Sequence, residues 1–132
     1  MRAGTIRTTI IALMSAELIY MSFWAGIIII VKAGLWTHDW LGFDGDNIVG
    51  AASAFQIGMV FVVTSLILLS LLLIIRFSKF TLYAYLCSII AHFIMWISLL
   101  DNDYYSGGFG FYVIMVEAAV TILILNLPKK TI

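Results

Sequence analysis

Four long apolar stretches, separated by short polar segments, dominate this 132-residue sequence. They cover residues 8–31, 48–75, 80–100 and 109–127. Each is long enough to cross a hydrocarbon core of about 30 Å as a helix, which takes about 20 residues. We therefore predict an all-α fold, a single transmembrane domain over residues 1–132 that forms an antiparallel four-helix bundle.

Composition agrees with this architecture. Hydrophobic residues make up 64% of the chain and charged residues only 11%, and the mean hydropathy is +1.13. A soluble domain of this size presents far more polar surface to water. The net charge is zero and no basic stripe is present, so nothing favours a nucleic-acid partner. The single cysteine, Cys87, excludes an internal disulfide and a cysteine-based zinc cluster.

Charge is distributed unevenly between the loops. Six of the seven basic residues fall at the N-terminus, in the second loop and at the C-terminus: Arg2, Arg7, Arg76, Lys79, Lys129 and Lys130. The first and third loops hold acidic residues instead: Asp39, Asp44, Asp46, Asp101 and Asp103. Because loops rich in Lys and Arg stay in the cytoplasm, we expect both termini to lie there.

Aromatic and small residues predict how the helices are anchored and packed. Aromatic residues that suit the headgroup region occur in both outer loops: Trp36, Trp40, Tyr104 and Tyr105. The second apolar stretch carries small residues at a spacing of four: Gly50, Ala54 and Gly58. Such spacing marks close helix–helix approach in membranes. We expect packing within the bundle, with a seam for a partner subunit as the alternative.

Each apolar stretch contains one strongly polar residue, namely Glu17, Gln56, His92 and Glu117 in chain order. We expect these four residues to reach a common layer near the membrane centre. A charged group there costs about 2.5–3.5 kcal/mol on insertion scales, so neutral, hydrogen-bonded carboxyl groups that tie helices together are the favoured interpretation. The alternatives are a proton or cation site and contacts with another protein's helix. No metal-ligand spacing, catalytic nucleophile–base pair or cofactor motif is found, so we expect a non-enzymatic protein.

Three local features resemble the superfamily of claudins, peripheral myelin protein and epithelial membrane proteins. They are Gly34-Leu35-Trp36, the segment AASAFQIGMV (51–60) and the segment NDYYSGGFGFYVIMVEAAV (102–120). The last resembles the helix-four entry of channel gamma subunits, with Glu117 as the acidic residue. The resemblance implies a compact bundle that scaffolds or modulates other membrane proteins. The chain lacks the superfamily's loop cysteine pair, and its first loop is shorter. Proteins with the MARVEL topology share the same outline.

A second resemblance concerns the small multidrug transporters. The segment Ala16-Glu17-Leu18-Ile19 is similar to their first helix, and this resemblance implies that Glu17 binds a proton and a cation in turn. The helix-three pattern of that family is absent here.

The sequence ends in KKTI, with Lys129 and Lys130 at the positions of a dilysine retrieval signal. Two lysines that anchor the last helix at the interface are the alternative. The signal favours the endoplasmic reticulum or early secretory pathway, and the plasma membrane is the other expected location. We expect an accessory, scaffolding or modulatory subunit whose partners are lipids and another integral membrane protein. The competing hypothesis is a small proton-coupled transporter that uses Glu17 and Glu117.

Overall fold

The computed structural model describes residues 3–36, 45–105 and 107–127, apart from the side chain of Phe109. Throughout these residues the regular structure is helical, without strands. The helices are α1 (Ala3–Lys32), α2 (Gly45–Ala51), α3 (Ala54–Ile75), α4 (Thr81–Leu99) and α5 (Gly108–Leu125). The predicted all-α class is confirmed.

The helix expected over residues 48–75 is broken into α2 and α3 at Ala52 and Ser53. The backbone N–H of Gln56 donates to the Ser53 hydroxyl at 3.2 Å. In return, the backbone N–H of Ser53 donates to the side-chain oxygen of Gln56 at 2.8 Å. This reciprocal capping box satisfies donors that a helix N-terminus leaves free. The prediction of one continuous helix is wrong because this polar pair starts a new helix inside the apolar stretch.

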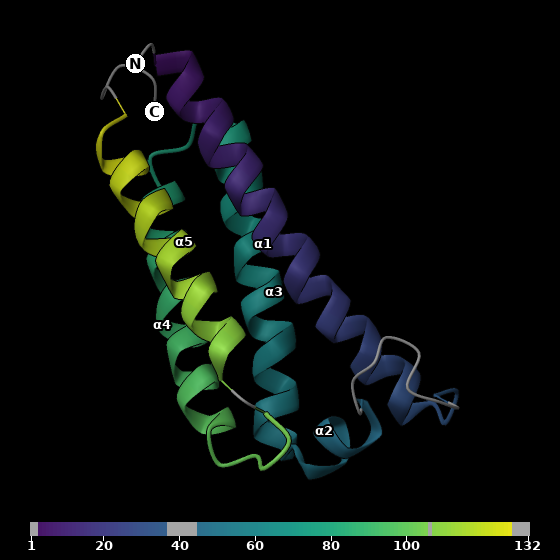
Figure 1. The fold of residues 1–132 in the computed structure, drawn as a ribbon. Helices are drawn as coiled ribbons and strands as arrows, with labels where there is room; N and C mark the ends of the chain where they lie inside the picture. The colour runs from purple at the N-terminus through teal and green to yellow at the C-terminus, as the bar shows by residue number, and fades with distance from the viewer. Residues whose placement is uncertain (1–2, 37–44, 106, 128–132) are drawn as a thin grey trace.

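The four long helices lie alongside one another, and α2 lies at one end (Figure 1). Helix α1 contacts α3 and α5, and α4 contacts the same two helices. We call the end with Arg7 and the α3–α4 turn (76–80) the Arg7 end. The opposite end, with residues 45–53, 100–105 and 107, is the α2 end (Figure 1).

Each long helix buries side chains that recur every three or four residues, the period of helices that pack nearly parallel. The buried stripe of α1 includes Ile10, Met14, Glu17, Met21, Ala25 and Ile28. Two apolar clusters result. The α2-end cluster contains Met21, Val49, Val60, Val63 and Met95, among others. The Arg7-end cluster contains Ile10, Met14, Leu71, Ile74, Tyr85, Val120 and Ile124, among others.

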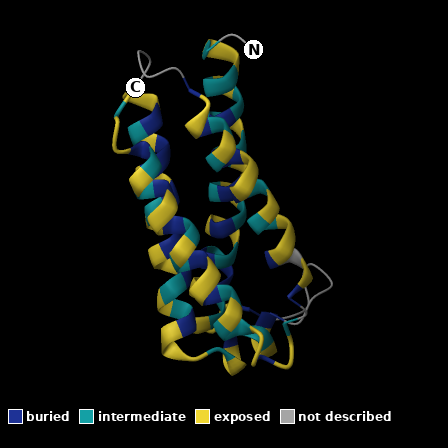
Figure 2. Cartoon of the chain, turned by 90° about the vertical axis from the view of Figure 1, so that its left-hand side faces the viewer, coloured by how far each residue is buried: buried dark blue, intermediate teal, exposed yellow. Residues whose placement is uncertain are grey.

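Much of the outward surface of the helices is exposed (Figure 2), and large apolar side chains populate it, including Ile19, Leu69, Ile90 and Ile122. Helices α1, α3 and α4 are each long and apolar enough to cross a membrane. Gly110–Leu125 of α5 is a shorter apolar helix. Three long apolar helices are compatible with a membrane-embedded protein.

Arg7 binds the last turn of α3 across 67 residues of sequence. Its guanidinium donates from Nε and Nη2 to the carbonyl of Ile74, at 3.1 and 2.9 Å, and also to the carbonyl of Ile75. The last carbonyls of a helix lack partners within it and favour a nearby cation. Arg7 therefore supplies the missing donors at this helix end.

The turn after α3 is closed by a residue with left-handed backbone geometry. Phe77 has a φ of 56°, a conformation that costs a non-glycine residue about 1–2 kcal/mol. The N–H of Ser78 donates to the carbonyl of Leu73 at 2.9 Å, as in a Schellman helix end. The Arg7 guanidinium lies 3.3 Å from the centre of the Phe77 ring, and this cation–π contact offsets part of the strain.

The predicted interface anchors differ in their surroundings. Trp36 is buried, and a Cβ atom added at Gly45 would lie 2.9 Å from its ring. The indole packs against the start of α2, and its role as a headgroup anchor stays a prediction. Tyr104 is 53% exposed at the α2 end, Tyr105 is half-buried, and Trp40 lies outside the described residues.

The small residues Gly50, Ala54 and Gly58 do not pack inside the bundle. All three are exposed, and a Cβ atom added at Gly50 or Gly58 would meet nothing within 4 Å. The helix break at Ser53 puts Gly50 on α2 and the other two on α3, which interrupts the regular spacing. The expectation that they bring helices of this chain together is therefore wrong.

Candidate functional site

Glu17 of α1 is buried against Tyr85 of α4. The Tyr85 hydroxyl lies 2.8 and 2.9 Å from the two oxygens of the Glu17 carboxyl group and donates to them. Tyr85 is fully buried, and Glu17 is 4% exposed. A buried carboxyl group is costly without a hydrogen-bond partner, so this bond makes Glu17 tolerable between α1 and α4.

His92 and Glu117 form a second buried pair, between α4 and α5. Nδ1 of His92 lies 2.9 Å from Oε1 of Glu117, and both side chains are almost fully buried. Oε2 of Glu117 has no hydrogen-bond partner within the described residues. The hydroxyl of Thr121, one turn further along α5, bonds to the backbone carbonyl of Glu117 rather than to the carboxyl group.

The two pairs form one cluster, which we call the polar core: Glu17, Tyr85, His92 and Glu117. Each of the two pairs includes one residue from the buried face of α4. Tyr85 and His92 lie seven residues apart, two turns along the buried face of α4. Two carboxyl groups, an imidazole and a phenol therefore lie buried within two turns of α4, where any net charge is poorly solvated.

Gln56, the remaining predicted member of the polar layer, lies apart from the polar core. Its side-chain oxygen accepts from the N–H of Ser53, and its amide nitrogen donates to the backbone carbonyl of Ser98. Gln56 therefore ties the start of α3 to the end of α4 near the α2 end. The four residues therefore do not form one layer. Glu17 pairs with Tyr85, His92 pairs with Glu117, and Gln56 caps α3.

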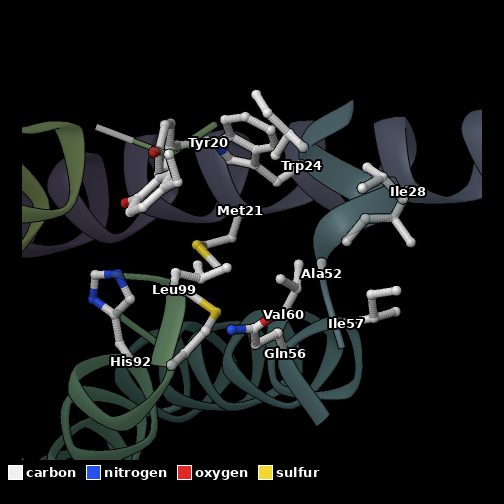
Figure 3. Close-up of a pocket in the computed structure, with 14 residues that line it drawn as sticks. Tyr20, Met21, Trp24, Ile28, Ala52, Gln56, Ile57, Val60, His92 and Leu99 are labelled. Atoms are coloured by element: carbon white, nitrogen blue, oxygen red, sulfur yellow. The ribbon is translucent and has the colours of Figure 1, made fainter. Parts of the chain in front are cut away.

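A partly open pocket of about 50 Å³ connects these two regions. It is lined by residues of α1 to α4 and by Tyr105, from Ile48, Ala52 and Leu99 near the α2 end to His92 beside the polar core. His92 and Tyr20 point into it from opposite sides (Figure 3). Charged side chains are absent from its lining within the part of the chain that the structure describes. Burial raises the pKa of Tyr105, in the loop above the pocket, to about 12.

The polar core lacks the features of a metal or hydrolytic site. Within the described ranges, no three His, Cys, Asp or Glu side chains are arranged to hold a metal ion. The three hydroxyl groups on the buried face of α4 are engaged. Thr81 donates to the carbonyl of Ser78, Tyr85 donates to Glu17, and Ser88 donates to the carbonyl of Tyr85. The chemistry that these residues offer is the binding and transfer of protons, because the imidazole and both carboxyl groups exchange them readily.

Tyr85 and Asn102 are buried residues with polar groups that the sequence analysis did not predict. Tyr85 shares the buried face of α4 with His92. Its position seven residues before His92 was the feature of the sequence that could have indicated its burial. Asn102 is 4% exposed; its amide donates to the carbonyl of Ile48 at 3.0 Å and its oxygen accepts from the N–H of Tyr104. Asn102 thereby fastens the loop after α4 to α2.

No protein-family model, curated protein or solved structure matches this chain. The similarity to claudins and their relatives therefore stays a prediction from the local motifs.

Proposed function

We propose that this chain is an integral membrane protein whose four long helices span the bilayer as an antiparallel bundle. One observation carries the proposal: Glu17, His92 and Glu117 are buried, whereas large apolar side chains cover the outside. A soluble protein has the opposite arrangement, and a hydrocarbon solvent requires this one. The 18 residues of α5 rise about 27 Å, close to the thickness of the hydrocarbon core.

Charge supports an orientation with both termini in the cytoplasm. Arg7, Arg76 and Lys79 belong to the Arg7 end, whereas acidic residues gather at the α2 end: Asp46, Asp101 and Asp103. The positive-inside rule assigns the Arg7 end to the cytoplasm. Lys32, at the end of α1, is the exception. The proposed location is the plasma membrane or the early secretory pathway, and Lys129 and Lys130 of the retrieval signal lie outside the described residues.

The role that we propose is that of a non-enzymatic accessory, scaffolding or modulatory subunit, like the claudin-like proteins and channel gamma subunits that the motifs resemble. The polar core does not serve as the contact with a partner helix, because Glu17, His92 and Glu117 are bonded within the chain. The exposed apolar faces are the surface that remains for lipids and for another integral membrane protein.

Purification of the tagged chain from its native membrane in a mild detergent tests this role. We expect a defined assembly that contains a larger membrane protein in a fixed ratio. Recovery of the chain alone, well folded and without any stoichiometric partner, would overturn the accessory role.

A small proton-coupled transporter is the second candidate, and the unpartnered Oε2 atom of Glu117 favours it. If the chain transports a solute, the double variant Glu17→Gln, Glu117→Gln in liposomes abolishes pH-driven flux while the protein stays folded. Unchanged flux in that variant would remove the transporter hypothesis. Absence of any flux in the unsubstituted chain would remove it too.

A further inference from the structure

The two halves of the molecule differ in their access to the polar core. The pocket extends from Ile48 and Leu99 to His92 and is partly open. On the other side of the polar core, the Arg7-end cluster fills the interior with buried side chains such as Ile10, Met14 and Ile74. The bonds from Arg7 to the last turn of α3 close that end. The pocket therefore lies between the polar core and the α2 end, whereas the interior toward the Arg7 end is a packed apolar plug.

His92 joins the pocket to the carboxyl group of Glu117. One ring nitrogen, Nδ1, contacts Glu117, while the ring reaches into the pocket (Figure 3). An imidazole can accept a proton on one nitrogen and release one from the other. About 50 Å³ is room for roughly four water molecules.

We propose that the pocket is a hydrated path from the α2 end to a proton-binding site formed by His92 and Glu117, closed toward the Arg7 end. A hydronium ion in the pocket gives a proton to Nε2 of His92, and the Nδ1 proton passes to Oε1 of Glu117. A neutral imidazole beside an ionised carboxyl group becomes a neutral imidazole beside a carboxylic acid. The pair thus gains one proton and loses one negative charge.

Other groups around this pair influence its proton affinity. Helix α1 contributes Glu17 and Tyr20, α4 contributes Tyr85, and the loop after α4 contributes Tyr105. The polar residue that α3 brings to the pocket is the uncharged Gln56. Glu17 is therefore the other buried carboxyl group of the polar core.

Two positions on the same face of α4 form a matched pair for testing the path. Met95 lies one turn from His92 and lines the pocket, whereas Ser88 lies one turn from His92 on the other side and does not. Both are buried. Each is replaced by cysteine in a Cys87→Ser background, and a permanently charged trimethylammonium methanethiosulfonate reagent is applied to sealed vesicles from either side.

We expect Met95→Cys to react from the side of the α2 end and Ser88→Cys to react from neither side. Failure of Met95→Cys to react in a folded variant means a dry pocket and overturns the proposal. Equal reaction at both positions also overturns it, because the plug would then be absent. The experiment rests on the proposed membrane insertion. If insertion itself fails, alkaline carbonate releases the chain from the vesicles, and this result distinguishes that failure from a dry pocket in an inserted chain.

Proton binding itself is measured by ¹⁵N nuclear magnetic resonance of histidine. The chain has two histidines, so His38→Gln leaves His92 as the single signal. The His92 nitrogen signals are expected to respond when the pH of the solution is lowered. Glu117→Gln is expected to alter this response more than Glu17→Gln does. Nitrogen signals that do not respond to pH would overturn the assignment of the proton site.

Discussion

At the scale of single residues, the hydroxyl of Tyr85 determines whether Glu17 is tolerated inside the helices. Tyr85→Phe keeps the ring but leaves the Glu17 carboxyl group buried without the donor that it has now. We expect a loss of about 1–3 kcal/mol in the free energy of unfolding, measured by titration with a denaturing detergent. Tyr83→Phe on the same helix, where Tyr83 is 67% exposed, is the control. Equal stability of the two variants would contradict the assigned role.

Any side chain larger than that of glycine at position 110 would force neighbouring residues to move. A Cβ atom there would lie 2.0 Å from Cδ1 of Trp96 and 3.0 Å from the Tyr105 hydroxyl oxygen, and the Trp96 indole is held by its bond to the Gly107 carbonyl. We expect Gly110→Ala to destabilise the protein by about 1–3 kcal/mol, as overpacked cores do. Gly58→Ala is the control, because its Cβ atom meets nothing. A neutral effect at Gly110 would mean that the indole moves freely.

Tyr105 predicts how stability depends on pH in the alkaline range. Its pKa is raised from 10.0 to about 12 in the folded protein, so the folded state holds this proton more tightly than the unfolded state. The stability that this group contributes is complete below about pH 10 and is lost as the pH rises toward 12. The difference in stability between the unsubstituted chain and Tyr105→Phe should shrink over that range. A constant difference across it would contradict the burial of Tyr105.

At the scale of the elements, the end of α3 depends on a residue from another helix. Arg7→Gln removes the charge and most of the donors that reach the carbonyls of Ile74 and Ile75. Because Arg7 is partly exposed, we expect a moderate loss of about 1 kcal/mol in unfolding free energy. Arg76→Gln, an exposed arginine at the same end, should have little effect. Similar losses in both variants would indicate a general charge effect instead.

The elements also show how far the sequence predicts structure. Hydropathy located α1, α4 and α5 well, because long apolar runs have few alternatives to helix. The break at Ser53 was missed, although Ser53 and Gln56 have the spacing of a capping box, because hydropathy averages over such a pair. Burial of the polar residues was expected, but their partners depend on which helix faces cross, and sequence periodicity alone does not give the neighbour of each face. For this reason Tyr85 was not predicted as the partner of Glu17, and Gln56 lies apart from the layer in which it was expected.

At the scale of the whole molecule, the proposed orientation gives a direct prediction. In a Cys87→Ser background, Ser78→Cys in the α3–α4 turn should react with a membrane-impermeant thiol reagent from the cytoplasmic side. Asp103→Cys in the loop after α4 should react from the opposite side. The reverse pattern would place the positive residues outside, and a mixed pattern would indicate two orientations of the chain.

The contact between Arg7 and the last turn of α3 also constrains the order of biosynthesis. The guanidinium leaves the ribosome before its acceptor carbonyls, which follow 67 residues later. Until those carbonyls are made, α1 remains without the contact that holds its beginning in place. Helix α1 therefore reaches its final position only after α3 has emerged, so this part of the bundle assembles from α3 back toward α1.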